Sequence, residues 1–457
     1  MAAQSATLPG AVSGGNALLD GNILPTLLRL AVPNVVAMIF AVLVGIAETR
    51  YVGLLGTVPL AAMALVFPFA MLTQMMSAGA MGGGVSSAIS RALGASDLAR
   101  AQTLALHALV IGVVAGTVHG ALFIMLGPVL YRWLGGQGEV LVQAVQFSQV
   151  LFLGAAPVWV MNALASVVRG TGNMRVPSLV ILATSLLQIL VGGVLGLGFG
   201  PIPRYGMPGV AIGSIVAFSA GSAYLLWYLG TGRGRLRLKF RGVPLQRSMF
   251  WDILRVGALA CLSPLQSVLA IVVMTGLVAR LGMVPLAGYS IGQRLEFLLI
   301  PIAFGIGVAS VPMVGMAMGA GQVARARRVA WIAGAVSGIN LAAIGLLVAL
   351  FPQLWAGMFS SDPAVLDAAC QYLRWAGPGF GFFGFGLTLY FAAQGSGKIL
   401  GPVLASTVRL VVVAGVGAWL ITWIDQSWPL FALVGGAMVV YGIATAWAVH
   451  ITSWTRR

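Results

Sequence analysis

Acidic residues, histidine and cysteine are all scarce in this sequence, which has nine aspartates and glutamates, three histidines and two cysteines among 457 residues. Cys261 and Cys370 lie in or near apolar stretches, so they indicate neither a disulfide framework nor a metal site. No cluster of histidine, cysteine and carboxylate has metal-ligand spacing, and no nucleophile elbow or triad pattern is present. We therefore expect a protein that is not an enzyme and has no cofactor.

Charge is equally sparse, whereas apolar residues are abundant. Only 7% of the residues are charged, 60% are hydrophobic, and the mean hydropathy is +1.00. A soluble core cannot use that much apolar surface, so the composition predicts a polytopic membrane protein. Residues 1–24 lack the basic start and compact apolar core of a signal peptide, and we interpret them as a cytoplasmic tail.

Apolar runs separated by charged or turn-rich gaps predict twelve membrane spans. None alternates with period two, so the spans are helices and not strands of a barrel. The predicted spans are residues 27–53, 59–88, 102–130, 141–167, 177–199, 208–229, 253–279, 285–315, 329–351, 367–393, 402–424 and 428–451.

The net charge is +16, and the basic residues are unevenly divided between the two sides of the membrane. Of the 25 basic residues, 18 fall on one side of the predicted spans and five on the other. The positive-inside rule makes the first side cytoplasmic, with both termini inside. The densest basic stretch, residues 231–248, could bind nucleic acid or anionic lipid, but we interpret it as a solvated linker near lipid headgroups. We therefore expect the bilayer, and no nucleic acid, as a partner.

An internal repeat divides the chain into two halves. LGTVPLAA at 55–62 recurs as LGMVPLAG at 281–288, and ALGASDLARA at 92–101 recurs as AMGAGQVARA at 317–326. RGTGNMRVP at 169–177 recurs as QGSGKILGP at 394–402, so the separations are 226, 225 and 225 residues. Each half has six predicted helices, an even number, so the halves run parallel. Transporters with repeats of this kind bind substrate between the halves.

These boundaries predict an N-lobe and a C-lobe joined by a basic cytoplasmic linker. The predicted segments are a tail at 1–24, the N-lobe at 25–232, the linker at 233–250, the C-lobe at 251–453 and a C-terminal tail at 454–457.

The first span contains two residues that membrane helices generally avoid. Pro33 removes a backbone donor and is expected to kink the helix. Glu48 places an ionisable group near hydrocarbon depth, which costs about 2.5–3.5 kcal/mol for a charge at the centre of a span. Such a residue indicates a function, here ion coupling by H⁺ or a possible Na⁺ at Glu48. The alternative is that the helix ends at Ala47 and leaves Glu48 at the interface beside Arg50.

Glu296 in the eighth span is the matching acid of the second half. It is a second candidate for ion coupling, although either it or nearby Arg294 could instead pair with a neighbour and lock the lobe. A carboxyl removed from water favours its neutral form, so a proton and a cationic substrate can compete for such an acid. We expect Glu48 and Glu296 to face one cavity, and nothing in the sequence explains Arg409 in the eleventh span.

Polar and adaptable residues in other spans are candidates for the substrate cavity. Gln293 lies one turn before Glu296, and Gln266 and Asn162 are amides in apolar spans, where hydrogen bonds between helices are an equal alternative. Met75 and Phe297 belong to groups of methionines and aromatics that suit varied ligands, although ordinary packing also explains each residue.

Several of these stretches together resemble the multidrug and toxic compound extrusion (MATE) family, from about Asn22 to about Tyr441. The resemblance rests on LAVP followed by the acid of AETRYVGLLG, on the paired stretches GASDLARA and GAGQVARA, on the RGTG…P and QGSG…P pair, and on QRLEFLLIPIAFGIGVA at 293–309. It implies two six-helix lobes around a central cavity, and it places an ion-coupling carboxylate at Glu48. Many proton-coupled relatives also have an Asn and an Asp on the fifth helix, where this sequence has Gln188 and Gly192.

The sequence thus predicts an all-α polytopic membrane protein with twelve transmembrane helices in two parallel-topology six-helix lobes. We expect a monomeric antiporter of the plasma (inner) membrane, which exports amphipathic, cationic small organic molecules in exchange for H⁺ or Na⁺. One alternative is a flippase for a lipid-linked precursor, which would need a strongly cationic cavity. A scaffold or receptor is a third reading, under which the acids inside the membrane would have no purpose.

Overall fold

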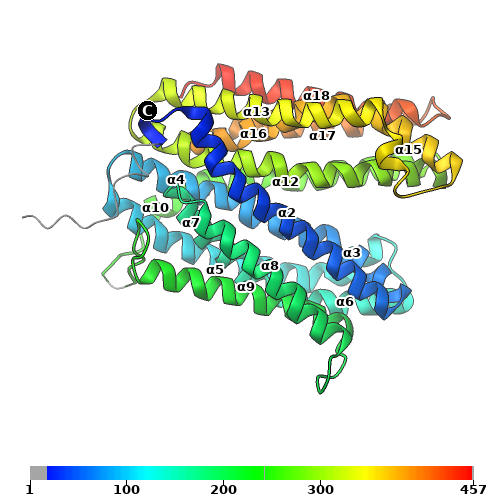
Figure 1. Cartoon of the computed structure of the whole chain (residues 1–457), viewed down its shortest axis with the longest axis horizontal. Helices are drawn as coiled ribbons and strands as arrows, with labels where there is room; N and C mark the ends of the chain where they lie inside the picture. Colours follow the sequence, from blue (N-terminus) through cyan, green and yellow to red (C-terminus); the bar gives the residue numbers. More distant parts are fainter. Residues whose placement is uncertain (1–17, 241, 455–457) are drawn as a thin grey trace, which may run out of the picture.

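The computed structural model describes residues 18–240 and 242–454 and is almost entirely helical (Figure 1). Across these residues the β structure amounts to a single bridge between Phe199 and Ile202. The all-α prediction is therefore confirmed. Most of the predicted N-terminal tail, Arg241 of the predicted linker and residues 455–457 lie outside the described residues.

The first half of the chain folds into helices that follow the first six predicted spans. A π-helical stretch, η1, continues α3 into α4, and a bend of 42° joins α6 to α7 as one broken span. The elements are α2 (Ile23–Leu55), α3 (Thr57–Gln74), η1 (Met75–Met81), α4 (Gly82–Gly94), α5 (Leu98–Trp133), α6 (Gly138–Leu153), α7 (Ala155–Gly170), α8 (Arg175–Leu197) and α9 (Gly206–Gly230).

The second half repeats this order with different breaks. Its first helix begins at Arg247, inside the predicted linker, and breaks at Cys261. The predicted tenth span is also divided, by the short 3₁₀ turn η2 between α15 and α16. The elements are α10 (Arg247–Ala260), α11 (Leu262–Ala279), α12 (Met283–Gly319), α13 (Val323–Leu350), α14 (Gln353–Ala356), α15 (Pro363–Ala376), η2 (Gly377–Gly379), α16 (Phe380–Ser396), α17 (Leu400–Leu420) and α18 (Trp428–Ile451).

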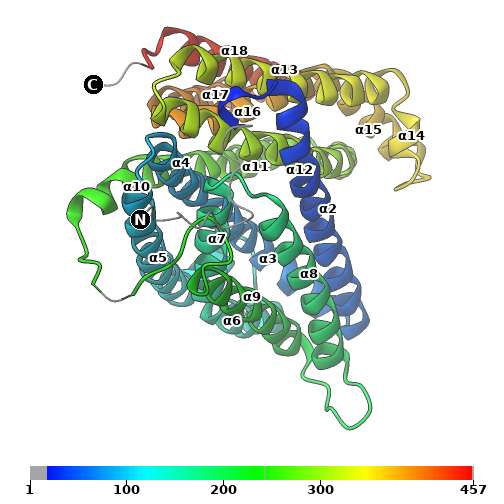
Figure 2. The ribbon, with the colours of Figure 1, turned by 60° about the vertical axis from the view of Figure 1, so that its left-hand side comes forward.

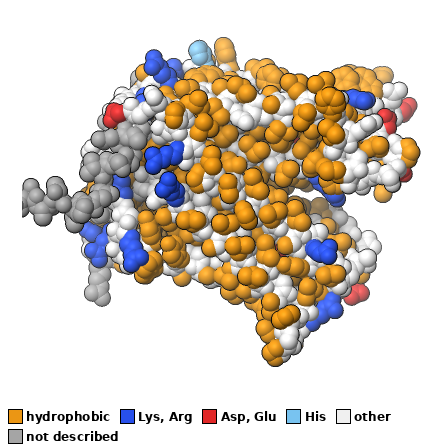
Figure 3. Space-filling model, viewed as in Figure 1, with side chains coloured by type: hydrophobic (Ala, Val, Ile, Leu, Met, Phe, Trp, Pro, Cys, Tyr) orange, Lys and Arg blue, Asp and Glu red, His pale blue; other side chains and the backbone are white. Residues whose placement is uncertain are grey.

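Within the described ranges, ten helical stretches are long and apolar enough to cross a membrane, and the α6–α7 pair makes an eleventh. The α15–η2–α16 stretch occupies the remaining predicted range, 367–393, in two shorter pieces. The helices thus account for all twelve predicted spans. Apolar side chains cover much of the middle of the surface, and the charged side chains gather toward its ends (Figure 3). Large apolar side chains such as Leu190 and Ile339 are 65% and 69% exposed. This is the surface of a multi-pass membrane protein.

The two halves share a hydrophobic core at one end of the molecule only. Leu18, Leu236 and Trp454 belong to that shared core, so this end, here called the terminal end, holds both described chain ends and the α9–α10 connection (Figures 1 and 2). Toward the opposite, or far, end each half has a core of its own. The far end is hollowed between the halves (Figure 3).

At the terminal end, glycines bring α4 and α12 into backbone contact. A Cβ atom added at Gly94 would lie 2.1 Å from the Met316 carbonyl oxygen, and one added at Gly319 would lie 2.2 Å from the Arg91 carbonyl oxygen. A shift of 225 residues exchanges these two contacts, because it relates Gly94 to Gly319 and Arg91 to Met316. Close approach of this kind is what small residues permit between membrane helices, and it closes the terminal end.

Candidate functional site

Glu48 lies well inside α2 and is partly buried, seven positions before the helix ends at Leu55. The alternative that the helix ends at Ala47 is therefore wrong. The Gln188 amide on α8 donates a hydrogen bond of 2.7 Å to Glu48 Oε1, and the Ser214 hydroxyl on α9 lies 3.4 Å from the same oxygen. No basic side chain in the described chain comes within 4.0 Å of this carboxyl group.

Glycine packing between α8 and α9 explains how three helices meet at Glu48. A Cβ atom added at Gly213 would lie 2.5 Å from the backbone of Gly192, so the two helix backbones are nearly in contact. This approach places Ser214 2.9 Å from the Gln188 amide nitrogen. The position where many relatives are expected to have an acid is therefore part of a close helix crossing, and Gln188 is the residue that contacts Glu48.

Glu296 has a different environment in the second half of the chain. It lies within α12, and the hydroxyl group of Tyr372 on α15 donates a hydrogen bond to its Oε1 atom. Tyr372 is fully buried and packs edge-on against the rings of Tyr289 and Phe431, with ring centroids 5.4 Å and 5.3 Å away. These contacts hold the phenol rigidly against the carboxyl group.

Glu296 also lines a cavity between the two halves of the chain. Met71, Met75 and Gly79 form the wall from the first half, while Phe297 and Arg409 belong to the wall from the second. Most other lining side chains are apolar or aromatic. Glu48 is not among them, so the structure does not place the two acids in one cavity as expected, because Glu48 lies between α2, α8 and α9 inside the first bundle.

Met75 and Phe297 thus border this cavity, whereas the three amide candidates do not. Gln293 donates to the Tyr289 hydroxyl (3.0 Å) on its own helix. Gln266 donates to the Thr407 hydroxyl (2.8 Å) and so joins α11 to α17. In both residues, therefore, the amide nitrogen bonds within the protein and not to the cavity.

Asn162 is nearly fully buried and joins helices of the first bundle. Its amide donates to Gln74 Oε1 (3.1 Å) and to the Ser77 hydroxyl (2.9 Å) at the start of η1. The structure thus favours the interhelical alternative for this residue, because its side chain satisfies the polar groups where the helix widens into its π-helical stretch.

Pro33 lies inside α2, which continues through it as a single helix. Next to it, the Asn34 amide donates to the Gly305 carbonyl oxygen of α12 (3.3 Å), and a Cβ atom added at Gly305 would lie 2.4 Å from Val35. The beginning of α2 therefore packs on the second bundle, whereas its end, with Glu48, packs on α8. Figure 2 shows α2 running between the two bundles.

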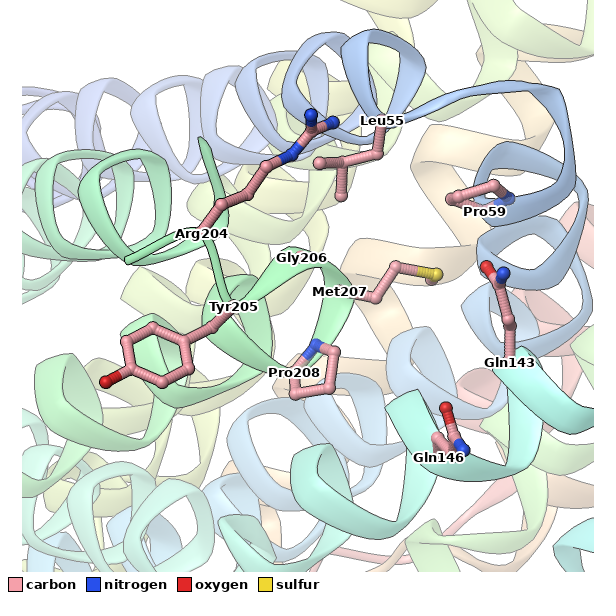
Figure 4. Close-up of a pocket in the computed structure, with 9 residues that line it drawn as sticks. All are labelled: Leu55, Pro59, Gln143, Gln146, Arg204, Tyr205, Gly206, Met207 and Pro208. Atoms are coloured by element: carbon pink, nitrogen blue, oxygen red, sulfur yellow. The ribbon is translucent and has the colours of Figure 1, made fainter. Parts of the chain in front are cut away.

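A second pocket lies at the far end of the first bundle (Figure 4). Leu55 and Pro59 line it together with Gln143, Arg204 and the start of α9. The Arg204 guanidinium also donates to the Leu54 carbonyl oxygen (3.4 Å). Neither Glu48 nor Glu296 lines this pocket, so we place the candidate site at the two acids and not here.

Arg409 and Gln188 are the residues whose place could not be seen in the sequence. Arg409 lies midway along α17 and faces the cavity that holds Glu296. In the sequence, Gln188 is visible only as a departure from the family pattern, and its bond to Glu48 joins positions 140 residues apart. The one available signal was that both residues are polar side chains within apolar spans.

Known proteins resemble this chain along most of its length. The sequence model of the MatE family matches residues 33–194 and 260–420, one stretch in each half. An FAD transporter from Shewanella oneidensis is 23% identical over 427 residues, covering 93% of this chain and 94% of that protein. The probable multidrug resistance protein NorM from Thermotoga maritima is 25% identical over 388 residues, covering 84% and 82%.

Solved structures show the same fold. A MOP superfamily transporter from Pyrococcus furiosus superposes with a TM-score of 0.88 at 23% identity, covering 95% of this chain and 97% of that one. A multidrug resistance MATE family transporter in an outward-facing conformation gives a TM-score of 0.86 at 24% identity, with the same coverage.

Proposed function

This chain belongs to the MatE family, and from that premise we propose that it exports amphipathic, cationic organic compounds across the plasma (inner) membrane in exchange for H⁺ or Na⁺. The relatives are transporters and not enzymes, which supports an activity without catalysis. The basic residues concentrated near the terminal end support a cytoplasmic location for that end. The conformation would then be open to the outside.

The observation that carries the proposal is the unpaired carboxyl group of Glu48. It lies within a membrane helix, receives bonds from Gln188 and Ser214, and has no basic partner within 4.0 Å in the described chain. A bare carboxylate there would cost about 2.5–3.5 kcal/mol if it lay at the centre of the span. A bound proton or Na⁺ removes that cost, and either ion would enter from one side of the membrane and leave to the other.

Both ions remain candidates for the coupling step. A proton needs only the carboxyl group itself. Sodium needs several oxygen ligands, as hard cations do, and the Glu48 carboxylate with the Ser214 hydroxyl and the Gln188 amide oxygen could supply them after rotation of the amide. The exchange is completed at the central cavity, where Glu296 attracts a cationic substrate. The α2 helix connects the two sites, since its ends pack on different bundles.

The experiment is efflux of a fluorescent cationic dye from proteoliposomes, with proton and sodium gradients imposed separately. We expect one gradient to drive efflux and Glu48→Gln to abolish the gradient-driven component, since a neutral amide cannot cycle between ion-bound and ion-free states. Glu139→Gln is the matched control, because Glu139 is an exposed acid at the start of α6. Unchanged ion-driven efflux by Glu48→Gln, with both variants folded, would rule out the assignment.

A flippase for a lipid-linked precursor is not favoured by the cavity. Pyrophosphate headgroups call for several cationic side chains, whereas Arg409 is the one basic side chain in the described lining, which also contains the acid Glu296. The FAD transporter among the relatives raises a second candidate, export of an acidic aromatic molecule, which Arg409 and the aromatic wall would suit. Adding FAD as a competitor in the same assay separates the two candidates. A site that binds only cationic substrates predicts no inhibition by FAD.

A further inference from the structure

Arg409 is a charged residue within a membrane helix that forms no ion pair. Its guanidinium group lies 5.3 Å from the Phe383 ring centroid and 5.8 Å from the Tyr441 ring centroid. Across the described residues, no carboxylate comes within 4.0 Å of it. Charged residues within spans are costly and usually mark a substrate or ion pathway.

The two aromatic rings position the guanidinium group but leave its hydrogen-bonding capacity unused. Rings attract the cation through their faces, whereas a guanidinium group carries five N–H donors in a fixed fork. The hydrogen bonds of the described chain include none from Arg409 to a protein acceptor, and Arg409 is partly exposed on the cavity wall. Its donors are therefore open to an acceptor within the cavity.

Glu296 brings the opposite charge to the same cavity from another helix. The cavity thus contains one carboxyl group on α12 and one guanidinium group on α17, which form no ion pair with each other. A purely cationic molecule bound at Glu296 would leave Arg409 without a counter-charge, and a purely anionic molecule would do the reverse. A molecule with both charges satisfies both groups.

The rest of the cavity lining suits flat, apolar cargo. Phe304 and Phe391 pack edge to face on the wall, with ring centroids 5.0 Å apart, and Met71 and Met75 face the cavity from the first bundle. Aromatic side chains stack on flat rings, and methionine adapts to irregular shapes.

We propose that the central cavity selects zwitterionic aromatic amphiphiles, with Glu296 binding the cationic group and Arg409 binding a carboxylate or similar acid through its N–H fork. The proposal rests on the export function proposed above and adds Arg409 as its specificity-determining residue. Bidentate recognition of a carboxylate is a geometry for which arginine is well suited.

Rhodamine B and its ethyl ester test this directly, because they share one cationic ring system and differ in a free carboxylate. In proteoliposomes, we expect Arg409→Gln to lower the transport efficiency of rhodamine B by about tenfold or more, and that of the ester by less than about twofold. Arg409→Lys keeps the charge without the fork and should restore part of the difference. Arg294→Gln is the matched control, because Arg294 is exposed and packs on the Phe359 ring.

Equal losses for both dyes in Arg409→Gln, or no loss for either, would overturn the proposal, as would export of the ester but not of rhodamine B by the unaltered protein. In those outcomes gradient-driven export of the ester would still support the proposed function. Export of neither dye by the unaltered protein contradicts both. Fluorescence anisotropy of each dye with purified protein separates binding from transport, and it should show the same selective loss for a folded Arg409→Gln variant.

Discussion

The two acids within the membrane sit in contrasting surroundings, although each half of the chain contributes one. Glu48 is enclosed within the first bundle and receives a neutral amide from Gln188. Glu296 receives a phenol from Tyr372 and faces the central cavity together with Arg409. An acid hidden from the cargo is suited to binding an ion, whereas an acid in the cavity is suited to binding the cargo itself.

The two acids differ although the two halves of the chain share an internal repeat. A shift of 225 or 226 residues relates the two halves, but it does not relate the two acids to each other, since each corresponds to apolar residues in the other half. Those counterparts are Val273 or Met274 for Glu48 and Ala70 or Met71 for Glu296. The repeat therefore conserves how the helices pack, while the chemistry differs between the halves.

The largest effect that tests this division is expected from Glu296→Gln. We expect it to raise the KM for a cationic dye by about tenfold or more, since a neutral amide cannot pair with the cation, and to leave gradient dependence intact. Initial efflux rates at several dye concentrations, with and without the driving gradient, measure both quantities. Loss of gradient dependence, as expected for Glu48→Gln, would show that the two acids share one role.

A smaller effect is expected from Gln188→Leu, which removes the amide donor from Glu48. Because a hydrogen bond to a carboxyl group that a bound ion has neutralised contributes about 0.5–1.5 kcal/mol, we expect coupled efflux to fall by about two- to tenfold. Gln266→Leu makes the same change in the second bundle, where the amide bonds a threonine and no acid. Its gradient-driven rate should change little, and equal losses in both variants would indicate a general packing defect.

The smallest effect is expected from Tyr372→Phe, which keeps the ring packing and removes one hydroxyl group from Glu296. The lost bond should reduce the free energy of unfolding by about 1 kcal/mol and change the dye KM only slightly. Thermal unfolding in detergent, read beside the transport assay, measures both. A KM increase as large as that of Glu296→Gln would mean that the phenol itself binds the cargo.

The spans and the all-α fold could be predicted because long apolar runs and a repeat in register are properties of the chain alone. Breaks such as the one at Cys261 could not, because the flanking apolar sequence is continuous. The contacts of Gln188 with Glu48 and of Gln266 with Thr407 depend on how the helices pack in three dimensions, so only the structure reveals them. When a helix is apolar on every side, its sequence does not indicate which side faces its neighbours. The sequence therefore did not show that Arg409 faces the cavity.

The exchanged glycine contacts at the terminal end have a consequence for how the protein moves. Gly94 rests on a carbonyl group of the other half, and Gly319 rests on the related carbonyl group of the first. The two bundles cannot separate here while either of these contacts persists. The contact between α4 and α12 must therefore open in one concerted step. A half-parted state that leaks in both directions is thereby disfavoured, which a carrier that works against a gradient requires.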